Sequence, residues 1–299
     1  MKILVTGASG LVGSAVVRHL SERGDEVIEL VRMEPREPAR QVRWNPLQGI
    51  EEPAKLEGVE AAIHLAGEPI AEGRWTDDKK RRIRESRIRG TSVLAEALTG
   101  LEQKPSVLLS ASAIGYYGSR GKEILREEST AGNDFLAQVC REWEEAAEPA
   151  ALSGIRVAQM RFGVILSAEG GALAKMLTPF KLGVGGRIGS GEQYMSWIAL
   201  EDVVGSIEHL LETESVRGPV NTVAPNPVTN AEFTKTLGEV LSRPTLFPVP
   251  KFALRLAFGE MADAALLASQ RVEPARLKES GYVFKYPDLR GALQHALKD

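Results

Sequence analysis

The sequence predicts an α/β fold, a doubly wound parallel sheet with helices on both faces, and three observations support this prediction. The chain opens with the unbroken apolar run Ile3-Leu-Val5, which is typical of a strand buried on both faces of a parallel sheet. Glycines follow directly at positions 7, 10 and 13. Apolar residues then recur at helical spacing from Leu11 to Leu20, and Gly24 stands where that helix would end.

A strand, a glycine loop and a helix in this order predict an anion-binding site. Free backbone N–H groups and the positive end of the helix dipole converge there, and glycines leave room for a pyrophosphate. The glycines could also serve only the turn. A second strand at 26–31 completes the context that favours dinucleotide binding in a Rossmann-type sheet. The contacts expected from this loop are Gly7, Ser9, Gly10, Leu11, Val12 and Gly13.

Composition limits the classes of protein that the chain can belong to. It has 299 residues, 43% hydrophobic and 26% charged, as in an ordinary soluble globular protein. The formal net charge of −3 predicts no attraction to nucleic acid or to an anionic membrane by the molecule as a whole. No run approaches the roughly 18 apolar residues of a membrane span. The single cysteine, Cys140, permits no intrachain disulfide, so we expect a cytoplasmic protein.

The end of the second strand indicates which nicotinamide cofactor is bound. An acidic residue there would bind the ribose hydroxyls of NAD, whereas a cation accommodates the 2′-phosphate of NADP. The strand ends at Val31 and Arg32, with Arg36 and Arg40 nearby, so NADP is favoured. The alternative is a solvated arginine, with Glu29 turned toward the ribose.

The next buried strand, expected within 59–67, ends in small residues. Leu65, Ala66 and Gly67 would let the backbone approach the cofactor closely. His64 lies inside the apolar run, where a hydrogen-bonded core histidine is favoured over a catalytic one.

A long helix expected at 74–99 carries many cations. Such a run is usually a solvated face. However, Lys80, Arg84 and Arg87 share one stripe, and Arg87 in particular is a candidate for a cofactor phosphate or ribose.

Two further strands, at 106–112 and 154–163, end in polar residues. Ser112 closes the first and would lie near the nicotinamide, unless its hydroxyl only satisfies the loop backbone. Arg161 closes the second and is a further candidate cofactor contact.

The composition of the sequence changes after residue 165, where glycines become frequent. We therefore predict an NADP-binding Rossmann domain at 1–165 and a smaller, mostly helical substrate lobe at 166–299, with parts of 200–224 returning to the core. Tyr194 and Trp197 could stack on a flat ligand or simply pack the glycine-rich loop before them. The residues of 244–299 expected in the core are Phe252, Leu256, Phe258, Leu266 and Leu267.

With these segments placed, the chain resembles the extended short-chain dehydrogenase/reductase family. More narrowly, it is similar to an atypical epimerase-like branch, labelled NAD-dependent epimerase/dehydratase or cell-division-inhibitor-like. The phrases that carry the resemblance are Ser112-Ala-Ile-Gly-Tyr-Tyr-Gly118, Gly185-Gly-Arg-Ile-Gly-Ser-Gly191 with Trp197-Ile198, and Leu267-Ala-Ser-Gln-Arg-Val-Glu-Pro274.

The resemblance implies catalysis by a serine, a tyrosine four residues before a lysine on one helix, and an asparagine on the preceding long helix. Ser112 matches the serine. The helix beginning near Phe135 has neither tyrosine nor lysine, and Arg87 stands where the asparagine would be. Tyr116 or Tyr117 could replace the missing proton donor.

The leading interpretation is an NADP-dependent oxidoreductase or epimerase acting on a polar carbonyl or hydroxyl compound, with a homodimer as a candidate assembly. The alternative is a catalytically degenerate sensor of NADP state, and nucleic-acid binding through 74–89 is disfavoured by the overall charge. The four scattered histidines and one cysteine offer no metal-ligand spacing.

Overall fold

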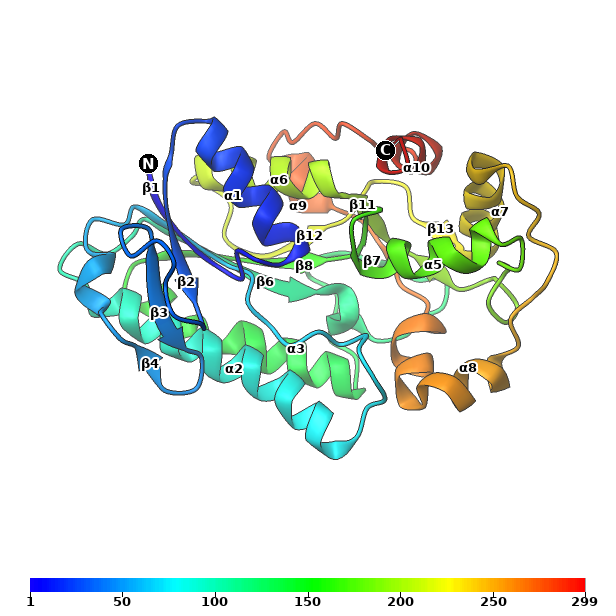
Figure 1. Cartoon of the computed structure of the whole chain (residues 1–299), viewed down its shortest axis with the longest axis horizontal. Helices are drawn as coiled ribbons and strands as arrows, with labels where there is room; N and C mark the ends of the chain where they lie inside the picture. Colours follow the sequence, from blue (N-terminus) through cyan, green and yellow to red (C-terminus); the bar gives the residue numbers. More distant parts are fainter. Residues whose placement is uncertain (299) are drawn as a thin grey trace.

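An eight-stranded sheet forms the centre of the computed structural model, which describes residues 1–298 (Figure 1). All neighbouring strands in it are parallel except β4, which runs antiparallel to β3. In spatial order the strands are β12 (Gly218–Thr222), β8 (Arg156–Phe162), β6 (Val107–Ala113), β5 (Ala61–His64), β1 (Lys2–Thr6), β2 (Glu26–Val31), β3 (Gln41–Asn45) and β4 (Gly49–Ile50). The predicted doubly wound sheet is confirmed.

Each face of the sheet is covered by its own set of helices. On β1, Ile3 and Val5 point into one core, and Leu4 points into the other, because side chains alternate along a strand. The first core is shared with α1 (Leu11–Glu22) and α6 (Leu200–Glu212), above the sheet in Figure 1. The second is shared with α2 (Asp77–Thr99) and α4 (Glu148–Leu152), and α3 (Phe135–Glu145) lies on the same side.

The strand order reverses beside β1, and this reversal positions the site. From β1 the chain builds outward through β2 and β3, then crosses to β5 on the other side of β1. The loops that follow β1 and β5 therefore leave the sheet in opposite directions, which opens a crevice at their carboxyl ends. The glycine loop at residues 7–10 lies at this point.

A smaller body beyond the sheet is built from α5 (Gly171–Lys181), α7 (Asn230–Leu241) and α10 (Leu289–Ala296), around Trp197 and Phe233. Thr229 and Glu232 form the capping box at the start of α7. Short strands complete it: β9 (Val164–Leu166) with β11 (Trp197–Ala199), and β10 (Tyr194–Met195) with β13 (Val228–Thr229). Between 200 and 224, α6 and β12 lie on and in the main sheet.

The remaining short elements connect these parts. They are the turn η1 (Pro53–Leu56), the turn η2 (Ile114–Tyr117), the strand pair β7 (Ile124–Leu125) with β14 (Arg271–Val272), the helix α8 (Lys251–Phe258), the π-helical turn η3 (Ala262–Leu266) and the helix α9 (Ala275–Glu279). No helix within 1–298 combines the length and apolar character needed to cross a membrane.

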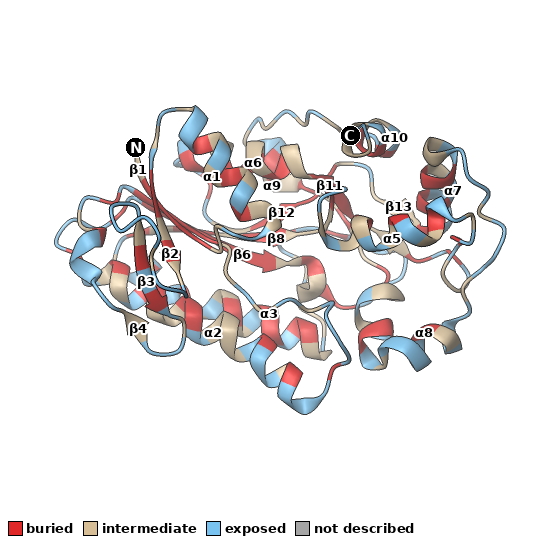
Figure 2. Cartoon of the chain, viewed as in Figure 1, coloured by how far each residue is buried: buried red, intermediate tan, exposed pale blue. Residues whose placement is uncertain are grey.

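The predicted core of the C-terminal segment is partly wrong. Phe252 and Leu256 are 72% and 75% exposed, and Phe258 is exposed as well. The helix α8 buries Leu254 instead, and Figure 2 shows most of its surface as exposed. Helical periodicity identifies which residues share a face, but it does not say whether another element covers that face.

Candidate functional site: the carboxyl edge of the sheet

Two of the three loop glycines are required by backbone packing. Gly7 has φ of +72°, and a Cβ there would lie 2.8 Å from the carbonyl carbon of Leu65 and 2.9 Å from the Ala66 nitrogen. A Cβ on Gly13 would lie 2.1 Å from the carbonyl oxygen of Gly7. The loop after β1, the start of α1 and the loop after β5 are therefore in direct contact, which only glycine allows.

Gly10 differs from the other two, because the fold itself does not demand a glycine there. Its φ is −81°, and a Cβ would approach the Gly7 oxygen at 3.3 Å, so that the oxygen would have to move by a few tenths of an ångström, far less than at Gly13. Gly10 is exposed and is the N-cap of α1, an end that no side chain within 1–298 caps. The helix start is thus free of side chains at the position where a pyrophosphate would approach, which fits the predicted cofactor.

The other predicted residues of this loop have mixed surroundings. Ser9 is exposed beside Gly10. Val12 packs against the core under α1, whereas Leu11 reaches across to Gly170, where an added Cβ would meet the Leu11 Cδ1 at 3.5 Å. Leu11 therefore connects the sheet to the start of α5.

Buried hydrogen bonds fix the carboxyl ends of β1 and β5 to each other. The His64 ring has Nδ1 at 2.7 Å from the Thr6 hydroxyl and Nε2 at 3.0 Å from the Thr91 hydroxyl. Thr6 also accepts hydrogen bonds from the backbone N–H groups of Leu65 and Ala66. Burial lowers the pKa of His64 from 6.5 to about 4. The structure thus places His64 as a core residue, as favoured from the sequence.

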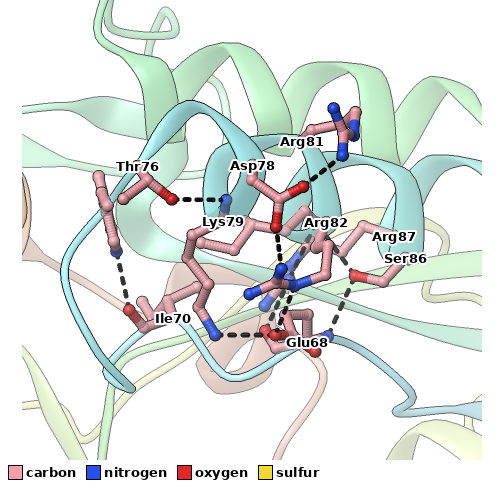
Figure 3. A network of polar contacts seen from close by, with 11 residues as sticks. Glu68, Ile70, Thr76, Asp78, Lys79, Arg81, Arg82, Ser86 and Arg87 are labelled. Carbon is pink, nitrogen blue, oxygen red and sulfur yellow. Dashed lines mark hydrogen bonds and ion pairs between the residues drawn. The ribbon is translucent and has the colours of Figure 1, made fainter.

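A network around Glu68 holds the next part of this loop against α2 (Figure 3). Lys79 donates to Glu68 Oε1 at 2.8 Å, and the Ser86 hydroxyl accepts from the Glu68 N–H at 3.1 Å. The hydrogen bond from Lys79 is the main reason that the pKa of Glu68 is lowered. Because Lys79 is itself buried, this network fixes the loop that contains the predicted contacts Leu65, Ala66 and Gly67.

Arg87 lies beside the loop, apart from the rest of the basic stripe. Lys80 pairs with Glu260 and Arg84 pairs with Glu142, so both face carboxylates. Arg87 Nη1 donates instead to the backbone oxygens of Glu68 and Ile83.

The guanidinium of Arg87 lies against Gly67 and a tryptophan ring. A Cβ on Gly67 would be 3.4 Å from the Arg87 Cζ, and that Cζ is 4.9 Å from the ring centroid of Trp143. Burial lowers the pKa of Arg87. A cation partly removed from water beside Gly67 fits an anionic or ribose group of a ligand.

The end of β2 opens into a cavity of about 410 Å³. Arg32 is exposed and lines it, directly after the half-buried Val31. Glu29, the residue that could have turned toward a ribose, accepts a hydrogen bond from Gln41 on β3 instead. The other lining side chains come from β3 and the loop after it, from Glu68, and from the exposed side of α2.

The polar residues at the ends of β6 and β8 form a closed cluster. Arg161 is 2% exposed, and its Nε and Nη2 each donate to Glu144 on α3 at 2.8 Å. Ser112 donates to the same carboxylate at 2.6 Å. Burial works against the charge of Arg161, yet the hydrogen bonds to Glu144 keep its pKa raised.

This cluster argues against two of the predicted roles. Tyr117 is fully buried, donates to Asn221 Oδ1 at 2.7 Å and accepts from Arg161 at 2.9 Å; burial raises its pKa to about 12. The guanidinium of Arg161 donates hydrogen bonds to Glu144, to Tyr117 and, at 3.2 Å, to the backbone oxygen of Glu127. The hydroxyl of Tyr117 and the guanidinium of Arg161 are thus both engaged by protein groups. A sequence places residues at strand ends but does not show which neighbours satisfy them.

Tyr116 has the opposite environment from Tyr117. It is half-buried, and its hydroxyl makes no hydrogen bond to another residue within 1–298. The Arg161 Cζ lies 3.5 Å from the centroid of its ring. Of the two candidate tyrosines, Tyr116 is therefore the one available for chemistry. The Ser112 hydroxyl, in contrast, donates its proton to a hydrogen bond with Glu144.

Sequence reasoning missed two carboxylates at this end of the sheet. Glu144 is the acceptor that organises the cluster, and its spacing from Leu136 and Cys140 on the inner face of α3 could have revealed it. Glu127 is buried, its Oε1 accepts from two backbone N–H groups, and its Oε2 has no partner among the described residues. Burial raises the pKa of Glu127.

For Trp197 and Tyr194, the sequence left open whether the rings stack on a ligand or pack the glycine-rich loop. Trp197 is completely buried and donates to the backbone oxygen of Asn226, so it packs the core and stacks on no ligand. The Arg271 Cζ lies over the Tyr194 ring, 5.1 Å from its centroid. Within 1–298, no group of three or more His, Cys, Asp or Glu residues is arranged to hold a metal ion.

Known proteins are similar to this chain in sequence and in fold. The model of the NAD dependent epimerase/dehydratase family matches residues 3–223, and a domain of unknown function, DUF1731, matches residues 249–296. The chain is 42% identical to the epimerase family protein Mb2239 of Mycobacterium bovis over 98% of this chain and 97% of the relative. It is 37% identical to the human epimerase family protein SDR39U1, over 98% and 99% of the two chains.

Solved structures agree with these sequence relations. The human epimerase family protein SDR39U1 (isoform 2), crystallised with NADPH, matches with a TM-score of 0.92 at 34% identity, over 100% of both chains. The UDP-N-acetylglucosamine 4-epimerase from Bacillus cereus shares the fold, with a TM-score of 0.78 at 18% identity over 99% and 98% of the two chains. From the matched family model and from relatives of this identity over nearly its whole length, the chain belongs to the NAD dependent epimerase/dehydratase family.

Proposed function

We propose that this protein is an NADP-dependent oxidoreductase or epimerase that acts on a hydroxyl or carbonyl group of a small polar substrate. The observation that carries the proposal is Gly10, a glycine that packing does not require, at the uncapped start of α1. The NADPH in the crystal structure of the human relative supports the same choice of cofactor.

In this proposal the residues of the edge have separate roles. The loop glycines hold the pyrophosphate, Arg32 meets the 2′-phosphate, and Arg87 contacts an oxygen of the phosphate or ribose. When bound, the nicotinamide supplies a site that accepts and returns a hydride. Tyr116 gives or takes the proton on the substrate oxygen, and Arg161 fixes the orientation of its ring.

Calorimetric titration of the wild type and of two variants tests the cofactor assignment. Gly10→Ala should keep the fold and weaken NADPH binding by about tenfold or more, because its Cβ enters the anion site. Arg32→Ala should weaken NADPH by about tenfold and leave NADH unchanged, because only NADPH has the 2′-phosphate. The matched control is Arg217→Ala, an exposed arginine beside the edge strand β12, on the other side of β1 from β2. Wild-type protein that binds neither nucleotide would end the proposal.

A second candidate function is a sensor of NADP state without turnover. The observation that favours it is the engagement of Ser112 with Glu144, which leaves this serine without a free proton for a substrate oxygen. Tyr116→Phe separates the two functions. An enzyme should lose about 10²–10⁴-fold in turnover on an active carbonyl or sugar-nucleotide substrate while its NADPH affinity is kept. A sensor should bind NADPH and show no turnover before or after the change.

A further inference from the structure

Apolar and basic side chains form an exposed surface around α8, and none of them has a role in the proposed function. Its apolar residues are Leu182, Val184, Leu246, Phe247, Phe252 and Leu256, all exposed; we call this the basic-apolar surface. Two segments supply them, 181–190 after α5 and 243–258 leading into and forming α8. Figure 2 shows α8 at the lower right, mostly exposed.

Backbone contacts make this surface continuous. The Gly189 N–H donates to the Val249 oxygen at 2.9 Å, and the Val249 N–H donates to the Arg187 oxygen at 2.8 Å. A Cβ on Gly186 would lie 1.8 Å from the oxygen of Phe247. The two segments therefore run in contact, and prolines at 244, 248 and 250 restrict the second one. The prolines and the backbone contacts therefore restrict the segments that carry these exposed side chains.

The charges on this surface have one sign. Neither segment contains an aspartate or a glutamate, and together they hold Lys181, Arg187, Arg243, Lys251 and Arg255, all exposed. On α8, Lys251 and Arg255 lie one turn apart, and so do Phe252 and Leu256 beside them. Asp263 pairs with Arg255 from outside the two segments. Since the whole chain has a formal charge of −3, this positive surface contrasts with the rest of the molecule.

We propose that the basic-apolar surface docks the protein onto an anionic lipid membrane. Outward Phe and Leu side chains flanked by Lys and Arg match an interface where acyl chains lie beneath negatively charged headgroups. A second copy of this chain fits less well, because a symmetric contact would bring the same cations of both copies together. The enzyme or sensor would thus work at a membrane surface without spanning it.

Co-sedimentation of the full chain with vesicles tests this proposal. Vesicles of phosphatidylcholine with phosphatidylglycerol should retain the protein, vesicles of phosphatidylcholine alone should not, and added salt should weaken retention. Phe252→Ser and Leu256→Ser should each lower the partition coefficient by about five- to tenfold, because an apolar side chain no longer enters the interface. Lys251→Gln should lower it by a smaller factor that vanishes at high salt.

Matched controls are Leu152→Ser and Val283→Ser, at residues that are at least as exposed but lie outside the surface, and Lys122→Gln for the charge. These three variants should bind vesicles like the wild type. The proposal is overturned by equal binding to both vesicle types, by no binding, or by equal losses in the controls. It is also overturned if light scattering shows a dimer that Phe252→Ser dissociates, because the surface would then belong to a second copy.

Discussion

The two halves of the sheet's carboxyl edge treat their polar and small residues in opposite ways. At the ends of β1 and β5 the loop glycines pack against neighbouring backbone beside the exposed Gly10, and at the end of β2 the exposed Arg32 lines a cavity. At the ends of β6 and β8, Ser112, Tyr117 and Arg161 bond to one another or to Glu144 and Asn221. One half leaves Gly10 and Arg32 exposed, whereas the other uses its polar groups to hold helix α3 and strand β12 in place.

This difference explains why a matching motif predicts binding more securely than catalysis in this chain. Glycine is needed in the loop for steric reasons that the sequence itself expresses. A serine or an arginine at a strand end has several partners to choose from, and the folded neighbours decide among them. Substitutions in each half test whether the two really differ, and their expected effects run from large to small.

Removing the cation from the closed cluster should have the largest effect on stability. Arg161→Met leaves the Glu144 carboxylate and the Tyr117 hydroxyl without their buried partner, which should cost about 3–5 kcal/mol of unfolding free energy. Denaturant titration measures this loss. Arg141→Met on the exposed side of α3 is the control and should change little. A small loss for Arg161→Met would mean that the cluster is not structural.

The histidine that joins β1 to β5 should make stability depend on pH. The folded pKa of His64, about 4, is depressed below its ordinary 6.5, so the neutral ring is favoured in the folded state. Its contribution is complete above pH 6.5 and is lost as pH falls from 6.5 toward 4, by about 3 kcal/mol.

Comparing unfolding free energies of the wild type and His64→Asn across pH 4–7 isolates this effect, because other titrating groups are common to both proteins. The wild type should lose more stability over this window than the variant. Parallel curves for the two proteins would show that His64 titrates normally and is not buried.

The glycine contact between the loop and α1 should be the next in size. Gly13→Ala puts a Cβ where the Gly7 oxygen lies and should destabilise by about 1–3 kcal/mol or more. Gly10→Ala, with a single 3.3 Å contact, should lose much less stability in the same denaturant titration. If the two variants lose the same free energy of unfolding, packing requires Gly10 as well, and this glycine no longer indicates a ligand site.

The smallest effect is expected from Arg87→Met. Methionine keeps the apolar part of this half-buried side chain but removes the cation beside Gly67, so NADPH binding should weaken by about tenfold, with a smaller change in stability from the lost bonds to the Glu68 and Ile83 oxygens. Calorimetry and thermal melting separate the two quantities. The control is Arg84→Met, whose partner is Glu142 on the outside of α3. Unchanged affinity in Arg87→Met would remove this residue from the binding half.

Much of the fold follows from local signals in the amino-acid sequence. The apolar run before Gly7 and the helical spacing after Leu11 predicted β1, the loop and α1 correctly. The predicted family is confirmed by the matched model and by relatives along the whole chain. The exposed Phe252 and Leu256 were wrongly expected in the core, because periodicity alone carries no information about what covers a helix.

The sequence by itself determined the architecture and the glycine loop, since both depend on short-range spacing and on the steric need for glycine. Only the tertiary structure decided that Tyr117 is fully buried while Tyr116 is half-buried, and that Glu144 on α3 accepts the hydrogen bonds of Ser112 and Arg161. Residues 112, 144 and 161 are far apart in the chain. Their contacts exist only because the parallel strands bring the ends of β6 and β8 side by side beneath one helix.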